Sequence, residues 1–169
     1  MTTAELLLQD YDVEMAMTRR ILERVPDDKP DFKCHEKSMP LGKLAMHVAT
    51  LPVFGTKILT TPSMDMAAPG HSWPDMTFRT RDTTLTAFDA AAAEARAALA
   101  ASSDADLAAI WKFSFGDRVL SNCPRSLAYR HMFFNHMVHH RSQLGVYLRL
   151  NDIPVPGLYG PSADEPFTP

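Results

Sequence analysis

Apolar residues recur at helical spacing in four long segments of the chain. These segments are residues 3–25, 38–60, 82–101 and 124–150. Each is long enough to form a helix with one apolar face. Four such helices joined by loops predict an all-α fold, a four-helix bundle, because that architecture buries all four faces together. The length of 169 residues is that of one ordinary domain, so we expect a single domain over residues 1–169.

Local signals indicate where these helices begin and where one is interrupted. Ser38 is suited to cap the second helix, because its hydroxyl can accept a hydrogen bond from a free backbone amide. Asn122 or Cys123 is expected to cap the last helix, with Pro124 in its first turn. Pro52 lies inside the second segment and lacks the amide donor of a continuing helix, so the sequence predicts a kink or a break there.

The helical projections also identify candidate core positions. In the first helix, Leu6, Val13 and Met17 lie close together on one face, and this stripe is widened by Leu7, Tyr11, Leu22 and Val25. The face of the third helix consists of Leu85, Phe88, Ala92, Ala95 and Leu99. The last helix has a second apolar side, formed by Leu127, Phe134, Val138 and Leu148. Because a helix with two apolar sides has two surfaces to cover, we expect a homodimer that buries this second side.

The connections and the C-terminal tail lack a helical pattern. Residues 61–80 and 102–121 are long enough to serve as crossover connections, and 61–80 is expected to hold little regular structure. In the second of them, aromatic and β-branched residues flank Gly116 and Asp117, a pattern that fits a short β-hairpin or an irregular loop. The proline-rich tail, IPVPGLYGPSADEPFTP, is expected to pack back on the bundle.

Three histidines form the candidate chemical site. His136 and His140 are four residues apart on the last helix, so both imidazoles point the same way and can bind one transition metal. His47 lies on the apolar face of the second helix and is the best candidate for a third ligand. Three imidazoles leave positions open for water or substrate. Zinc and nickel both suit imidazole, and the ligand type does not separate them from iron or copper.

The remaining histidines fit this site less well. A single buried histidine is more often a hydrogen-bonded core residue than a ligand, so spacing carries the assignment. His131 and His139 turn away from the ligand face, and His139 is the nearer of the two and therefore the alternative ligand. His35 and His71 lie in predicted loops, where solvent exposure is the simplest interpretation.

Three polar residues lie beside the predicted site. Asp10 and Gln143 are on or near buried stripes, and either could orient a ligating imidazole through a hydrogen bond, although a polar contact in the core is the simpler role. Arg141 follows the last predicted ligand directly, and its simplest role is an ion pair at the surface or at an interface.

Composition and charge exclude several functional classes. The net charge of −3 gives no electrostatic argument for binding nucleic acid. Two cysteines far apart are no disulfide framework, and a reduced cytoplasmic protein is the default. The acidic first residues do not resemble a signal peptide, and no apolar stretch is long enough to span a bilayer, so no membrane association is expected.

Two stretches of the sequence resemble the DinB-like superfamily. HMFFNHMVHHRSQLGVYLRLNDIPVPGLYGPSADE is similar to its C-terminal His-x-x-x-His-Arg-x-Gln helix and Tyr-Gly-Pro tail, and LGKLAMHVA to its second-helix motif. On these motifs His47, His136 and His140 match the family's metal triad, whereas Ser142 stands where the family often has glycine. The resemblance implies a four-helix bundle, a bound divalent metal, typically nickel or zinc, and often a homodimer.

Family members of known activity include bacillithiol S-transferases and a mycothiol-dependent maleylpyruvate isomerase. The resemblance therefore implies a metal-dependent thiol S-transferase or hydrolase acting on a small molecule, with a low-molecular-weight thiol as a candidate co-substrate. We expect the substrate to enter near the connections at 61–80 and 110–120, where Trp73 and Trp111 could wall a pocket. The alternatives are a non-catalytic bundle stabilised by metal and a stress-linked interaction protein.

Overall fold

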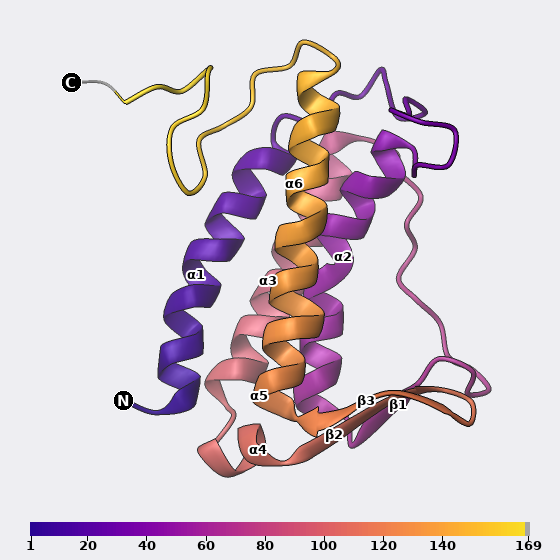
Figure 1. Cartoon of the computed structure of the whole chain (residues 1–169), viewed down its shortest axis with the longest axis vertical. Coiled ribbons are helices and arrows are strands. Elements are labelled where there is room, and N and C mark those ends of the chain that lie inside the picture. Colours follow the sequence, from indigo (N-terminus) through magenta and orange to yellow (C-terminus); the bar gives the residue numbers. More distant parts are fainter. Residues whose placement is uncertain (168–169) are drawn as a thin grey trace.

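The computed structural model describes residues 1–167 and contains a bundle of four long helical segments (Figure 1). Three are α1 (Thr3–Leu22), α2 (Leu41–Thr60) and α3 (Arg81–Ala100). The fourth consists of α5 (Arg125–Ala128), a π-helical turn η1 (Tyr129–Phe134) and α6 (Asn135–Arg149), which follow one another directly. A short helix, α4 (Asp104–Ala108), follows α3. Within residues 1–167, no helix is long and apolar enough to cross a membrane.

A small sheet at one end of the bundle makes the fold mainly helical, and the all-α prediction was wrong in this respect (Figure 1). Its strands are β1 (Ser63–Asp65), β2 (Ile110–Phe115) and β3 (Arg118–Pro124), in that order. β2 and β3 form an antiparallel hairpin, and β1 joins β2 in parallel. Gly116 has φ 56° at the hairpin turn, a conformation that glycine adopts without steric cost. The hairpin at 110–120 is thus confirmed.

The start of α2 and the start of the last helical segment differ from the sequence-based expectation. Pro40 precedes α2 and Pro124 precedes α5, and neither residue caps its helix through a side chain. The predicted caps were wrong: Ser38 lies outside the helix, and Asn122 and Cys123 belong to β3. α2 continues through Pro52 without a break, because both sides of the residue are held in the bundle by buried neighbours.

The core contains part of the α1 face that was expected, since Tyr11 and Leu22 are buried. Leu6 and Val13 are about half exposed, so their predicted burial was wrong. The buried positions are Tyr11, Met15, Thr18 and Leu22, which are spaced by four, three and four residues. Met15 and Thr18 were missed, because a polar threonine does not mark a core position in a pattern of apolar residues.

The second apolar side of the last helix does not form an exposed surface. Phe134 and Leu148 are buried within the bundle, so the predicted dimer face cannot consist of all four residues. Leu127 is 46% exposed and Val138 is half-buried. One chain thus covers much of what a partner was expected to cover, because α6 packs against both α1 and α2 (Figure 1).

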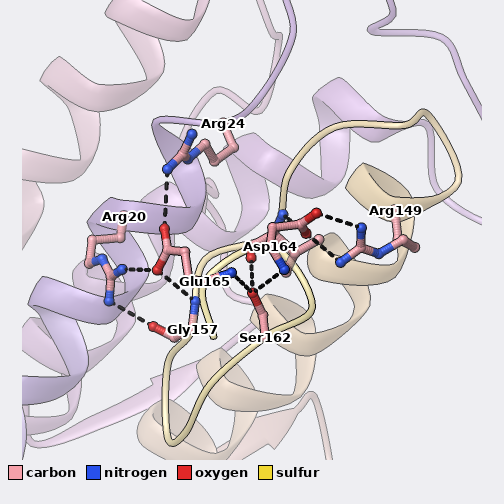
Figure 2. A network of polar contacts seen from close by, with 8 residues as sticks. Arg20, Arg24, Arg149, Gly157, Ser162, Asp164 and Glu165 are labelled. Atoms are coloured by element: carbon pink, nitrogen blue, oxygen red, sulfur yellow. Dashed lines mark hydrogen bonds and ion pairs between the residues drawn. The ribbon is translucent and has the colours of Figure 1, made fainter. Parts of the chain in front are cut away.

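The C-terminal tail packs back on the bundle, as expected. Figure 2 shows Glu165 held by Arg20 of α1 and by Arg24, which follows that helix, while Asp164 pairs with Arg149 of α6. The tail therefore joins the first and last helices through ion pairs at the molecular surface.

Candidate metal centre

The structure brings the three predicted histidines together. His47 comes from α2, and His136 and His140 come from α6. The Nε2 atom of His136 lies 3.4 Å from Nε2 of His47 and 2.9 Å from Nε2 of His140. One ring nitrogen from each residue lies within 4.8 Å of the other two, and all three side chains are half-buried. The three residues form a triad that could bind a metal.

The helical geometry explains this convergence. The i, i+4 spacing places His136 and His140 on one face of α6, and α6 packs against α2. His47 lies on the face of α2 that also carries Leu51 and Phe54, both buried. The apolar residues therefore hold the two helices together. The imidazoles meet at the edge of this helix–helix contact, where the side chains are only half-buried.

The spacing of the nitrogens fits a shared cation. Two imidazoles bound at about 2.05 Å to one tetrahedral ion have their nitrogens about 3.4 Å apart. The separation of His47 and His136, 3.4 Å, equals this distance, and that of His136 and His140, 2.9 Å, is half an ångström shorter. In a neutral imidazole each ring nitrogen either donates or accepts a hydrogen bond. Three converging nitrogens therefore cannot be paired one to one with each other. A cation at this point would use all three lone pairs.

Gln143 orients one of the imidazoles. Its Oε1 lies 2.8 Å from Nδ1 of His140 and accepts the Nδ1 proton, which leaves Nε2 as the atom with the free lone pair. Gln143 is exposed, so the polar core contact expected as its simpler role was wrong and the alternative role beside an imidazole is the one observed. Asp10 does not orient an imidazole; its carboxylate pairs with Arg130 at the surface, at 2.9 Å. The expectation for Asp10 was wrong because its neighbour on the last helix is an arginine.

The three histidines are held in the neutral form that a metal requires. Burial, with the neighbouring His140 and His136, lowers the pKa of His47 to about 4. Burial also lowers the pKa of His136 and of His140, and in His140 the hydrogen bond to Gln143 opposes this effect. Neutral imidazoles at pH 7 offer lone pairs without prior loss of a proton.

A cavity of about 1000 Å³ opens beside the triad, with His47 and His136 in its wall. Most of the remaining wall is apolar and comes from α2, the connection at 61–80 and the sheet. His71 and His131 line the same cavity, and Nε2 of His71 is buried without a hydrogen-bond partner among residues 1–167. The solvent exposure expected for His71 was therefore wrong, since its loop folds back over α2.

The predicted pocket residues lie partly where they were expected. Trp73 lines the cavity, whereas Trp111 is fully buried behind Phe54 and does not. His139 stays exposed beside His140 and is not needed as a replacement ligand. Lys57, which also lines the cavity, was missed. It is ten residues after His47, about 80° round the helix from that ring, so the spacing of the ligand face alone did not indicate it.

Arg141 is the largest departure from expectation near the site. Its side chain is 1% exposed, although a surface or interface ion pair was predicted. The guanidinium donates to the Glu14 carboxylate at 2.7 Å, to the Glu14 carbonyl and to the Thr18 hydroxyl, and it also contacts the hydroxyl of Tyr159. The residue that follows the last histidine thus joins α6 to α1 and the tail.

Comparisons with known proteins agree with this architecture. A model of the DinB family matches residues 1–167. A crystal structure of a DinB-like protein from Bacillus cereus is 24% identical, with a TM-score of 0.66, and covers 90% of this chain and 95% of its own. A DinB-like protein from Bacillus subtilis is 16% identical, with the same TM-score, and the match covers 88% and 96% of the two chains. No curated protein matches the sequence.

Proposed function

The chain belongs to the DinB family, and from this premise we propose that it is a divalent-metal-dependent enzyme of the thiol S-transferase or hydrolase type that acts on a small molecule. The observation that carries the proposal is the cavity beside the triad, because two of the three candidate ligands form part of its wall. Three protein ligands leave coordination positions open, as catalytic sites do. A substrate in the cavity would lie next to those positions.

The side chains of the site have distinct roles in this proposal. His47, His136 and His140 would hold the metal, for which nickel and zinc are the candidates. A divalent ion held in this way lowers the pKa of a bound thiol or water and so supplies a nucleophile near neutral pH. Gln143 fixes the ring of His140, and an apolar substrate bound against the cavity wall would displace water from the reacting groups. The co-substrate would be a low-molecular-weight thiol.

Metal analysis of protein purified without a histidine tag tests the proposal. We expect about one divalent ion per chain in the natural sequence and loss of that ion in His140→Ala. His139→Ala is the matched control, because the neighbouring ring is exposed and outside the triad. Thiol conjugation and ester hydrolysis are then measured for the same three proteins. Equal metal content in the natural protein and His140→Ala would refute the assignment.

A metal-stabilised bundle without catalysis is the second candidate. The triad joins α2 to α6, so a bound ion would cross-link two helices that are distant in the sequence. A chelator that lowers the melting temperature, in a protein that turns over no thiol or ester, would favour this alternative. The homodimer also stays a prediction, and light scattering at micromolar concentration tests it.

A further inference from the structure

One face of α2 forms a wall of the cavity beside the triad. Going from His47 toward the sheet, this face presents Thr50, Phe54 and Lys57 to the cavity. The ten residues from His47 to Lys57 correspond to about 15 Å of helix axis. A molecule that fills this length would have one end at the triad and the other at Lys57.

The wall between these two ends is apolar and adaptable. Its large side chains include Phe54, Met64, Met66, Trp73, Phe113 and Met132. Trp73 packs edge-on against Phe54, with ring centroids 5.9 Å apart, and remains 47% exposed. Flexible thioethers and an open aromatic edge suit a hydrocarbon body better than a sugar or a nucleotide, which need many polar partners.

Lys57 supplies a positive charge at the far end. Every ion pair found among residues 1–167 uses an arginine or the terminal amine, so no carboxylate in that part of the chain neutralises the Lys57 amine. Asp65 is the one acidic residue in the described wall, and its carboxylate accepts the backbone amides of Ala67 at 2.9 Å and Gly116 at 2.8 Å. The cavity therefore offers a free cation and an acid that is already bound.

We propose that the cavity binds an elongated apolar carboxylate, with its hydrocarbon body along α2, its anionic group at Lys57 and its other end at the triad. The identity of the reacting end rests on the proposed function, whereas the binding of the carboxylate at Lys57 does not. Decanoate is a suitable probe, because it joins a hydrocarbon chain of comparable length to a single carboxylate.

Binding is measured on the full chain by tryptophan fluorescence, since Trp73 lies in the wall, and by calorimetry, both in the presence of a chelator. The chelator removes any metal that could bind the carboxylate at the triad end. We expect decanoate to bind more tightly than decyltrimethylammonium. Hexanoate should bind on the order of a hundredfold more weakly than decanoate, because it lacks four methylene groups.

Substitution of Lys57 separates the anionic end from the apolar body. We expect Lys57→Met to weaken decanoate by about five- to tenfold and to leave the neutral 1-decanol unchanged. Lys37→Met, an exposed lysine outside the cavity, should leave both affinities unchanged. Three results would overturn the proposal: no decanoate binding by the natural protein, equal affinity for the cationic analogue, or decanoate affinity unaltered in Lys57→Met.

The metal assignment is tested separately with the same probe. His140→Ala should lose its metal and still bind decanoate, because Lys57 and the apolar wall are unchanged in this variant. If the proposed metal-dependent function is wrong, the natural protein would contain no metal and would still bind decanoate. Failure of the carboxylate proposal would appear as absent or charge-independent binding with the metal present.

Discussion

Removal of the Glu14 carboxylate should destabilise the protein more than removal of the Arg141 cation with which it pairs. The Arg141 side chain is 1% exposed and that of Glu14 is 16% exposed. Glu14→Ala leaves a buried guanidinium with neutral partners, namely the residue 14 carbonyl and the hydroxyls of Thr18 and Tyr159. Arg141→Met removes the buried charge and keeps an unbranched apolar side chain in its place.

The structure sets the size of these two effects. Breaking a buried pair by removing one partner costs about 3–5 kcal/mol, because the other charge stays desolvated. We place Glu14→Ala near the lower limit, at about 3 kcal/mol, because three oxygen partners remain around the guanidinium. In Arg141→Met the Glu14 carboxylate can reach water through its exposed edge, so we expect about 1–2 kcal/mol. The double variant should be no less stable than Glu14→Ala alone, since no unpaired charge is left.

Urea unfolding, followed by far-ultraviolet circular dichroism, gives the free energy of unfolding of the natural protein, the two single variants and the double variant. For a chain of this size, about 3 kcal/mol corresponds to a melting-temperature decrease of roughly 6–12 °C. The reasoning is refuted if Glu14→Ala costs under about 1 kcal/mol, or if the two single effects simply add in the double variant. Either result would mean that water solvates the guanidinium despite its position between α1 and α6.

Two further predictions concern packing and pH. Gly55→Ala should destabilise the fold by about 1–2 kcal/mol, because its Cβ would lie 3.0–3.2 Å from the buried ring of Phe133. Gly145→Ala is the control, because its Cβ would make ordinary contacts of 3.5 Å and 3.7 Å. It should be neutral or stabilising in the same urea titration. Arg149 and the Val155 amide lower the pKa of Asp164, and the Gly157 amide and Arg20 lower that of Glu165. Their folded-state pKa values lie below the unfolded values, so their stabilisation is complete above the ordinary carboxyl range and is lost below about pH 4. Backbone relaxation measured by NMR should show a tail that is ordered at pH 6 and mobile at pH 3, and equal order at both would contradict this.

The triad could be predicted from sequence because two of its three histidines follow a local rule. The i, i+4 spacing of His136 and His140 fixes their relative orientation without knowledge of the rest of the fold. His47 required the further assumption that apolar faces of two helices meet, and α2 and α6 do pack together. The spacing within one helix depends on helix geometry alone. Its prediction was therefore unaffected by the wrong helix caps and core positions predicted elsewhere in the chain.

The residues that sequence analysis misplaced depend on contacts between distant segments. Arg141 is buried because Glu14, 127 residues earlier, supplies a carboxylate, and no pattern near Arg141 indicates this partner. His71 lies against the cavity because its loop folds over α2. The short strand β1 forms because β2 lies beside it in parallel, so three residues without a pattern of their own become part of a sheet.

The wide turn η1 affects how this chain should be aligned with its relatives. A π-helical turn contains one residue more than an α-helical turn. The extra residue is accommodated within that turn, so the side chains of the flanking α-helical segments keep their orientation relative to the bundle. A relative with one residue fewer opposite Tyr129–Phe134 is therefore expected to have a regular helix there and to present its downstream histidines in the same direction. A single-residue gap in this segment would then mark an insertion tolerated by evolution, and the histidines that follow it would still correspond.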